Sequence, residues 1–227
     1  MSWQDWVRGV EIEPSVYAAD LARLGDDVAR VLDAGARIFH VDTGDGHFVE
    51  PVTIGPIVVA SIAPLVHERG GVLDCHLMVS NPERHFVQVA RAGGDSVTFH
   101  AETTGDPART AALARGQGLS VGLAFNPETE VEAATEAALV AGAELVLCMS
   151  IHPGYSGQEL LPESYGRLER LRGLLPAEVH VQVDGGVSLA NAARLRETGA
   201  DLIVAGSAVF HADDVGRAYA ELARAVS

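Results

Sequence analysis

The segment Ala34–Asp42 reads AGARIFHVD, a small-residue turn followed by a short β-rich run. Its glycine is placed to cap the end of a helix, and residues 37–42 have strand character. Similar turns of the type AGA, AGG or TGA occur at Ala92–Gly94, Ala141–Ala143 and Thr198–Ala200. These turns precede every second β-rich run, which indicates a helix–turn–strand unit repeated along the chain.

Working outward, β-rich runs alternate with amphipathic stretches over the whole chain. The expected strands are Val10–Ser15, Arg37–Asp42, Val72–Met78, Ser96–His100, Ser120–Phe125, Leu145–Ser150, Glu178–Asp184 and Leu202–Gly206. Helical patterns follow them, for instance Leu21–Asp33, Pro82–Ala92, Glu128–Val140 and Leu189–Glu197. Eight βα units of similar length predict an α/β fold, a (β/α)₈ TIM barrel. No linker or low-complexity segment interrupts them, so we expect one barrel domain over residues 1–227.

The charge balance restricts the possible partners. The net charge is −15, and all 16 cations are arginine, with no lysine in the chain. A chain this acidic is repelled by nucleic acid and by anionic membrane surfaces, so neither is expected as a partner. Without a lysine amine, a Schiff-base mechanism is excluded.

The cysteines and the N-terminal segment favour a reducing compartment. Cys75 and Cys148 lie in apolar, strand-like runs 73 positions apart, where buried reduced thiols are expected. The N-terminal sequence MSWQDWVRGVEIEPS lacks a basic segment followed by an apolar one. No apolar run reaches transmembrane length. We therefore expect a cytoplasmic protein.

Potential metal ligands stand at the ends of several strands, where barrels of this kind carry their active sites. Side chains alternate along a strand, so His40 and Asp42 both face the barrel mouth. The same parity puts Asp74, His76 and Met78 on one side of the third strand. It also groups His180, Gln182 and Asp184 on the seventh.

Two imidazoles and two carboxylates at one mouth form a mixed nitrogen and oxygen site. Taken singly, a strand histidine is more often a hydrogen-bonded core residue, and an aspartate at a strand end is often a helix N-cap. Together, His40, Asp42, His76 and Asp184 predict a site for one divalent ion, namely Zn²⁺, Fe²⁺, Mn²⁺ or Co²⁺.

Glycines at three further strand ends predict a phosphate site. They lie in Pro153–Gln158 after the sixth strand, in Asp184–Gly186 at the seventh and in Ala205–Ser207 at the eighth. Glycine lets backbone N–H groups approach an anion, and a following helix N-terminus adds a favourable dipole. Isolated tight turns are the simpler interpretation of one such end, but three neighbouring ends favour phosphate binding.

These motifs resemble the ribulose-phosphate 3-epimerase family over nearly the whole chain. The matching stretches are Pro14–Ser15, His40–Asp42, Asp45–Val49, Asp74–Met78, Phe99–Glu102, Asn126–Pro127, Pro153–Tyr155, Gly157–Gln158, Asp184–Gly186 and Gly206–Ser207. The resemblance implies a ribulose-phosphate-binding type of TIM barrel, an isomerase of the pentose phosphate pathway, and a homo-oligomer.

Carried over residue by residue, the resemblance assigns the site. It implies one divalent metal ion per subunit on His40, Asp42, His76 and Asp184, with Asp42 and Asp184 as the two acid/base groups. Ser15 and His76 would contact the sugar. The phosphate would be held by Gly154, Tyr155, Ser156, Gly157, Gly185, Gly186, Gly206 and Ser207. The implied reaction is the conversion of D-ribulose 5-phosphate to D-xylulose 5-phosphate through a metal-stabilised enediolate.

One departure from the family pattern bears on the substrate. Gly44 replaces a methionine of the thioether cap over the reacting carbons, while Met78 and Met149 remain as pocket-lining residues. Either the pocket is wider and takes a larger ketose phosphate such as allulose 6-phosphate, or Tyr17 or His152 fills the gap. A non-catalytic sugar-phosphate binding barrel is a further alternative, which the retained aspartate pair disfavours.

Overall fold

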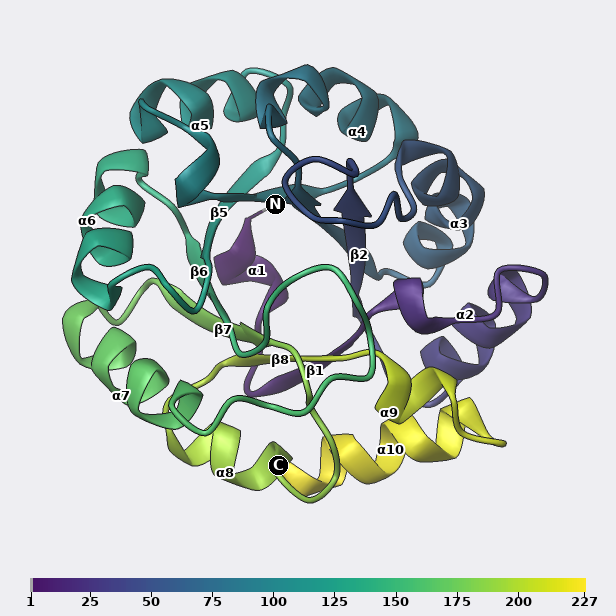
Figure 1. Cartoon of the computed structure of the whole chain (residues 1–227). Helices are drawn as coiled ribbons and strands as arrows, with labels where there is room; N and C mark the ends of the chain where they lie inside the picture. Colours follow the sequence, from purple (N-terminus) through teal and green to yellow (C-terminus); the bar gives the residue numbers. More distant parts are fainter. Residues whose placement is uncertain (1) are drawn as a thin grey trace.

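The computed structural model describes residues 2–227, and within that range the strands form one eight-stranded parallel sheet curled into a barrel (Figure 1). Neighbouring strands pair in the order β1-β8-β7-β6-β5-β4-β3-β2. A bridge between Ser15 and His40 joins β1 to β2 and completes the ring. The strands are β1 (Glu11–Pro14), β2 (Ile38–Gly44), β3 (Val72–Met78), β4 (Ser96–His100), β5 (Ser120–Phe125), β6 (Leu145–Met149), β7 (His180–Asp184) and β8 (Leu202–Ala205).

All the helices but the first, whose tryptophans pack into the barrel interior, surround this barrel. The helices are α1 (Trp3–Trp6), α2 (Leu24–Asp33), α3 (Pro56–Glu68), α4 (Phe86–Ala92), α5 (Pro107–Arg115), α6 (Val131–Ala141), α7 (Ser164–Leu174), α8 (Ala192–Glu197), α9 (Ser207–Phe210) and α10 (Val215–Ala225). Short 3₁₀ turns η1 (Val16–Ala18), η2 (Pro82–Arg84) and η3 (Ala101–Thr103) follow β1, β3 and β4. The predicted TIM barrel is confirmed.

The repeated small-residue turns have the predicted geometry. Gly35, Gly93, Gly142 and Gly199 all have φ between 58° and 106°. This left-handed conformation ends the preceding helix and turns the chain into β2, β4, β6 and β8. The AGA-type repeat is therefore a helix-capping device at alternate units of the barrel.

Several predicted helix starts were too early. The chain at Leu21 is still a turn, because Asp20 Oδ1 accepts a hydrogen bond from the Ala22 backbone, and α2 begins at Leu24. The stretch Pro82–Ala92 divides into η2 and α4. Likewise α6 begins at Val131, and α8 begins at Ala192 after a turn that Asn191 closes onto Ser188.

The predicted strands are right in number and nearly right in extent. Three match to the residue, and four others lose one or two terminal residues to the loops, as at Glu178, where a turn delays β7 to His180. Only β2 is longer than expected at its carboxyl end. It continues to Gly44 because Thr43 and Gly44 still pair with Leu77 and Met78 of β3.

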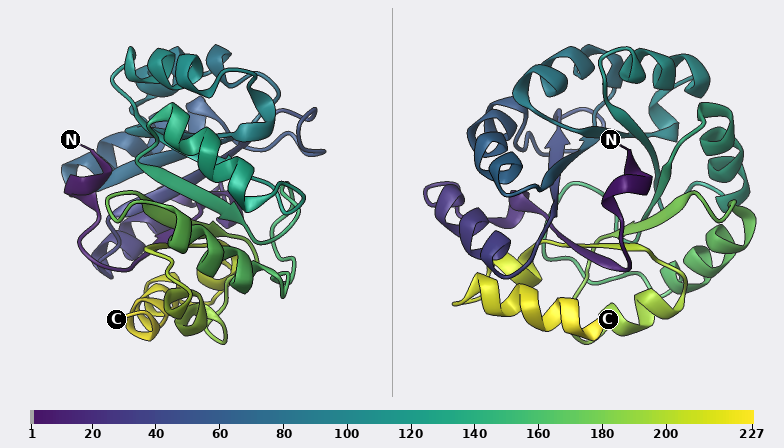
Figure 2. Two further views of the ribbon diagram at one scale, coloured as in Figure 1. Left: turned by 90° about the vertical axis from the view of Figure 1, so that its left-hand side faces the viewer. Right: turned by 180° about the vertical axis from the view of Figure 1, so that it is seen from behind.

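The alternation along each strand divides the core into two parts. Outward-facing residues such as Phe39 and Val41 pack under the helices in the larger apolar cluster. A smaller cluster fills part of the barrel interior, where Leu145, Leu147 and Leu202 pack with Trp3 and Trp6 of α1. Figure 2 shows α1 across the amino ends of the strands. Both cysteines are buried and unpaired, as predicted.

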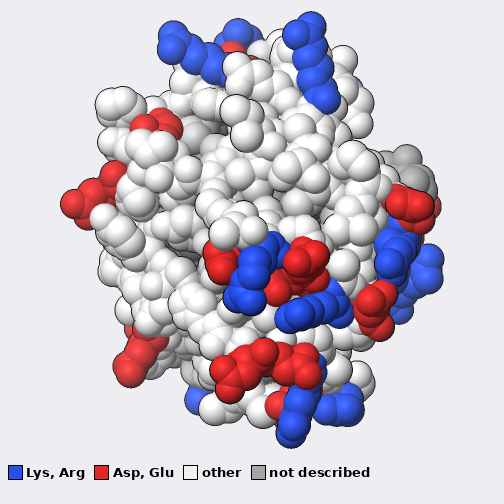
Figure 3. All heavy atoms as spheres, turned by 90° about the vertical axis from the view of Figure 1, so that its right-hand side faces the viewer, with Lys and Arg blue, Asp and Glu red and all other residues white. Residues whose placement is uncertain are grey.

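The surface bears interleaved charges on the side that carries α2 and α3 (Figure 3). Arg69 pairs with Asp33 at 2.7 Å, and Arg23 pairs with Asp20 at 3.1 Å. Exposed pairs of this kind contribute little to stability. Within residues 2–227, every helix is too short or too polar to span a bilayer.

Candidate active site

A pocket opens at the carboxyl ends of the strands. Its lining residues are Ser15, Tyr17, Asp42, Met78, Met149, Ile151, Pro153, Gly154, Tyr155, Ser156, Gly157, Asp184, Gly185, Gly186, Val187, Val204, Gly206 and Ser207. Nearly every residue expected to contact the sugar or its phosphate therefore lies around one cavity. His76 is the exception: it is fully buried and reaches the pocket through Asp42, whose Oδ1 is 2.9 Å from His76 Nδ1.

The four side chains expected to bind a metal ion meet at the inner wall of this pocket. His40 Nε2 lies 3.2 Å from Asp42 Oδ1, and Asp184 Oδ2 lies 3.9 Å from His76 Nδ1. One ligand atom from each of the four residues lies within 4.8 Å of the others. The parity of β2, β3 and β7 brings them together, because their inward positions share the barrel mouth.

The two aspartates have opposite protonation preferences. Burial raises the pKa of Asp42, but the charges and hydrogen bonds of His40 and His76 outweigh burial and hold this pKa well below its usual range. At Asp184, burial and the negative charge of Asp42 act in the same direction and raise the pKa to about 7. Asp42 is therefore ionised at neutral pH, whereas Asp184 keeps a proton up to that range.

The cluster favours a positive charge at its centre. Burial lowers the pKa of His40, yet the nearby carboxylates of Asp42, Asp74 and Glu13 outweigh it and raise the pKa well above its usual value. The buried His40 Nε2 lies 3.2 Å from Asp42 Oδ1 without the angle of a regular hydrogen bond. A nitrogen held beside carboxylates in this way fits a divalent ion with mixed nitrogen and oxygen ligands, which would take the place of the proton.

A second polar layer lies beneath His40. Its Nδ1 is 3.1 Å from Asp74 Oδ2, which also accepts a hydrogen bond from Gln182 Nε2 at 3.1 Å. Gln182 donates to Glu13 as well, and all of these side chains are fully buried. The layer fixes His40 so that Nε2 is turned towards the mouth. The alternation of side chains along β3 and β7 groups Asp74 and Gln182 with the predicted ligands. The sequence analysis did not include Glu13, although an acidic residue between Ile12 and Pro14 in the first strand could have indicated it.

Two glycines keep the loop after β7 tight against the pocket. Gly186 has a φ of 65°, and a Cβ there would overlap the backbone nitrogen of Leu160. A Cβ on Gly185, where φ is 117°, would overlap the side chain of Ile151. Side chains are therefore excluded at both positions, and the bare backbone forms the pocket wall, as an anion site requires.

Gly44 does not line the pocket as the sequence suggested, because the chain after β2 covers it. A Cβ on Gly44 would lie 2.8 Å from Val49 Cγ2 and 2.9 Å from the carbonyl oxygen of Pro51. Thr53 Oγ1 ties this segment down by donating to the Asp42 carbonyl and accepting from the Gly44 N–H. Of the two residues suggested to fill the gap, Tyr17 lines the pocket, whereas His152 is 63% exposed and pairs with Glu128.

One residue to which the sequence assigned no chemistry lies directly behind the cluster. His100, at the end of β4, is fully buried, and its Nε2 is 2.8 Å from Nε2 of His76. The available signal was the pair His100 and Glu102, which share a short motif after the fourth strand.

Comparisons with known proteins agree with this architecture. The model of the ribulose-phosphate 3 epimerase family matches residues 11–210. A ribulose-phosphate 3-epimerase of Mycobacterium tuberculosis (strain ATCC 25618 / H37Rv) is 39% identical over 219 residues, covering 95% of this chain and 93% of the relative. One from Schizosaccharomyces pombe is 41% identical over 202 residues, covering 89% of this chain and 87% of the relative.

Among solved structures, the 3-hexulose-6-phosphate synthase of Salmonella typhimurium superposes with a TM-score of 0.72. Its sequence is 16% identical, and the match covers 95% of this chain and 98% of that chain. At this level of identity the likeness concerns the barrel fold alone.

Proposed function

Because this chain belongs to the ribulose-phosphate 3-epimerase family and is an isomerase acting on carbohydrates, we propose that it inverts carbon 3 of a ketose phosphate. The proposed pair is D-ribulose 5-phosphate and D-xylulose 5-phosphate. The proposal rests above all on Asp42 and Asp184, two carboxylates on one pocket with opposite protonation. Epimerisation next to a carbonyl removes a proton and returns one from the other face, which needs one acceptor and one donor.

Asp42 is the more firmly oriented of the two. Ser15 Oγ donates to its Oδ2 at 2.5 Å, while His40 and His76 both lie against Oδ1. These contacts fix the direction of the carboxylate and leave it ionised, so it is placed to accept a proton from carbon 3. Asp184, whose side chain is 16% exposed at the pocket, is the partner that donates one. The roles exchange in the reverse direction.

We further propose that the reaction depends on one divalent metal ion. His40, Asp42, His76 and Asp184 would hold it, and Zn²⁺, Fe²⁺, Mn²⁺ and Co²⁺ all suit these ligands. When bound, the ion would supply positive charge beside the substrate oxygens and so stabilise the enediolate.

The phosphate end is assigned to the glycine-bearing loops. Gly154–Gly157 follow β6, Gly185 and Gly186 follow β7, and Gly206 and Ser207 follow β8, and all of them line the pocket. Their backbone N–H groups and the serine hydroxyl would bind the phosphate without a cationic side chain. This arrangement suits a chain whose overall charge of −15 disfavours anions.

The cover over Gly44 favours a pentulose over a larger sugar. The space beside Gly44 is filled by Val49, Pro51 and Thr53, so the wider pocket, one of the two alternatives that the sequence left open, loses its support. A 3-epimerase of another ketose phosphate is therefore the second candidate. A non-catalytic binding barrel is disfavoured, because a binder has no use for two proton carriers. Oligomeric state and cytoplasmic location stay predictions.

The test is to follow turnover of ribulose 5-phosphate in D₂O with metal-reconstituted protein. Formation of xylulose 5-phosphate with deuterium at carbon 3, abolished by a chelator and by Asp184→Asn, is the expected result. Deuterium exchange with poor net conversion, together with faster turnover of a hexulose phosphate, would select the second candidate. Absence of exchange with any ketose phosphate by the metal-loaded protein would refute an epimerase function.

A further inference from the structure

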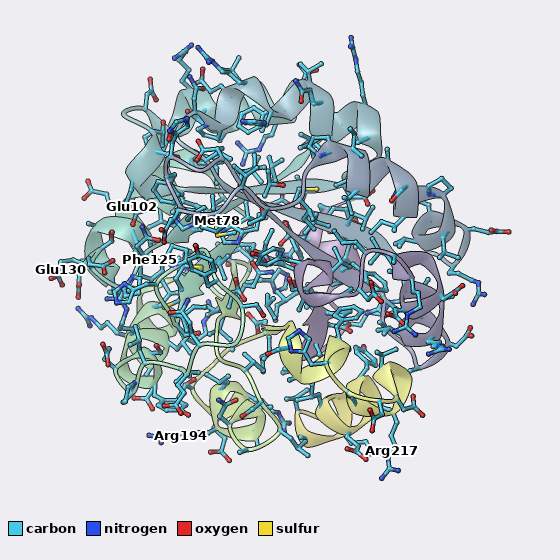
Figure 4. The ribbon with its side chains drawn as sticks, turned by 45° about the vertical axis from the view of Figure 1, so that its right-hand side comes forward. Met78, Glu102, Phe125, Glu130, Arg194 and Arg217 are labelled. Atoms are coloured by element: carbon cyan, nitrogen blue, oxygen red, sulfur yellow. The ribbon has the colours of Figure 1, made fainter. Side chains whose placement is uncertain are left out.

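Two residues outside the proposed ligand set lie behind it, His100 at the end of β4 and Glu102 in η3. Figure 4 labels Glu102 and Phe125, and the backbone N–H of Asn126, the residue after Phe125, donates to Glu102. His100 is fully buried, whereas the side chain of Glu102 is 24% exposed. The reaction proposed above assigns neither residue a task.

His76 and His100 meet edge to edge. Their Nε2 atoms are 2.8 Å apart, their ring planes differ by 22°, and their centroids are 5.0 Å apart. Because the nitrogen atoms are much closer than the centroids, they lie between two nearly coplanar rings, as in a hydrogen bond. Phe48 covers His100 at a centroid distance of 4.7 Å. One Nε2 must donate and the other must accept.

Glu102 stands at the far end of this pair. Its Oε2 lies 3.3 Å from His100 Nδ1, and its Oε1 accepts from the backbone N–H of Asn126 at 2.8 Å and from Thr129. Burial raises the pKa of Glu102, but the hydrogen bonds from His100, Thr129 and Asn126 outweigh it and lower the pKa to about 2. The carboxylate is therefore ionised and can only accept hydrogen bonds.

These contacts connect Glu102 to the metal ligands through two rings. An ionised Glu102 keeps a proton on His100 Nδ1, which in a neutral ring leaves His100 Nε2 as an acceptor. His76 Nδ1 and Asp42 Oδ1 lie 2.9 Å apart, where an ion would take the place of the proton between them. With the ion in that place, His76 Nε2 would donate to His100 Nε2, and the lone pair of His76 Nδ1 would be free for the ion. That atom is the one that faces Asp42 and Asp184. Carboxylate–histidine contacts behind metal ligands set the tautomer and orientation of those ligands in the same way.

We propose that His100 and Glu102 are positioning residues that hold His76 in the tautomer whose bare Nδ1 binds the divalent ion. The proposal deepens the function proposed above and rests on its metal site. An imidazole binds a metal ion in its neutral form. A neutral ring has a single proton, so the hydrogen bond with His100 decides which nitrogen is free for the ion.

Glu102→Gln is the sharpest substitution, because it keeps the shape and reverses one hydrogen bond. The carbonyl oxygen of the new amide would stay with the Asn126 N–H, which can only donate. The NH₂ group of the amide would then face His100 Nδ1 and favour the tautomer with that nitrogen bare. Thr129→Ala is the matched control, since it removes another contact of the same carboxylate and leaves the His100 contact in place.

The first measurement is metal affinity by competition with a Zn²⁺-chelating dye, which involves no substrate. Glu102→Gln should weaken Zn²⁺ binding roughly 10- to 100-fold, the range found for loss of groups that orient metal ligands. Thr129→Ala should stay within about twofold of the unsubstituted protein, by the same argument. Equal affinities of the Glu102→Gln and unsubstituted proteins would overturn the proposal.

The second measurement needs no variant and stands even if Glu102→Gln fails to fold. Histidine-selective ¹⁵N correlation spectra of the Zn²⁺-loaded protein should show protons on His100 Nδ1 and His76 Nε2. A bare Nδ1 on His100 would overturn the proposed positioning of His76 by His100 and Glu102. A protein with these signals that cannot epimerise any ketose phosphate would refute the proposed function alone. A protein with no measurable Zn²⁺ affinity would refute both the metal site and the positioning role of His100 and Glu102.

Discussion

At the amino ends of the strands the barrel is closed by α1 (Figure 2), whereas at the carboxyl ends it opens onto the pocket. The closed base is apolar: Trp3 is fully buried, Trp6 nearly so, and both pack against Ile38, Val72 and Leu145. The open mouth instead buries His40, Asp42 and His76 beside Asp184. The base gains free energy mainly from burying apolar surface, whereas the mouth also buries charged groups beside Met149 and Ile151.

The same strands carry residues that stabilise the fold at their amino ends and residues of the candidate active site at their carboxyl ends. Strand β2 contributes Ile38 to the base and Asp42 to the mouth, four residues apart on the same inward face. Burial of charged groups is costly unless they are paired, so the mouth depends on its mutual contacts and, in the function proposed above, on an ion. Substitutions at the base should therefore lower stability, and substitutions at the mouth should lower activity.

Asp42→Asn should give the largest effect. The amide keeps the size of the side chain but cannot accept the proton from carbon 3, so kcat should fall by roughly 10²- to 10⁴-fold or more. The fall in kcat is measured from initial rates with ribulose 5-phosphate. Asp201→Asn, near the base, is the control, because Asp201 pairs with Arg172 and His180 and is remote from the pocket. A comparable loss of kcat in both variants would contradict the assignment of activity to the mouth and of stability to the base.

Trp3→Ala should produce the converse result. Removing a fully buried tryptophan should lower the free energy of unfolding by about 3–5 kcal/mol, measured by urea denaturation. At a temperature where the variant is folded, kcat should be unchanged. Leu189→Ala, at a side chain that is 54% exposed, is the control and should alter neither quantity. A tenfold drop in kcat for folded Trp3→Ala would mean that the base shapes the mouth.

Glu13→Gln probes the layer between the two ends. Burial, partly offset by a hydrogen bond with His40, raises the pKa of Glu13 from 4.5 to about 7. The folded protein therefore holds this proton more tightly than the unfolded chain, and stability falls as pH rises from 4.5 to 7. The contribution is on the order of 3 kcal/mol.

The measurement is the free energy of unfolding of metal-free protein at pH 4.5 and pH 7, with and without the substitution. Glutamine carries no titrating proton, so the Glu13→Gln protein should lose less stability over this window than the unsubstituted protein. The same pH dependence in both proteins would show that Glu13 is already ionised in the folded state.

The sequence predicted which strand ends form the mouth and most of the residues around it, because both depend on patterns among neighbouring residues. Strand parity decides that His40 and Asp42 share a face, and a capping glycine such as Gly35 decides where β2 can begin. What escaped prediction depends on contacts between segments far apart in the chain. Glu13 becomes part of the site only because β1 closes the ring beside β2 and reaches His40.

Two further residues at the mouth depend on contacts that the sequence does not display. His100 gains a role only when β3 and β4 pair, because that pairing brings it against His76. At Gly44 the sequence leaves open a wider pocket or a gap filled by another side chain, since it shows the lost methionine but not the path of the loop that replaces it. The covering segment is held by hydrogen bonds of Thr53, nine residues further along.

Gly44→Met should have the smallest effect of these substitutions. It tests whether the loop after β2 fills the space beside Gly44 at the mouth. If the loop truly fills the gap, restoring the family methionine pushes Val49 and the Pro51 carbonyl aside and lowers the free energy of unfolding by about 1–3 kcal/mol. Turnover of ribulose 5-phosphate should not improve. Gly173→Met, at a helical glycine with no atom near its added Cβ, is the control and should be neutral or slightly stabilising. A Gly44→Met protein of undiminished stability and higher kcat would mean that the methionine site is still open, and would return the larger ketose phosphates to consideration.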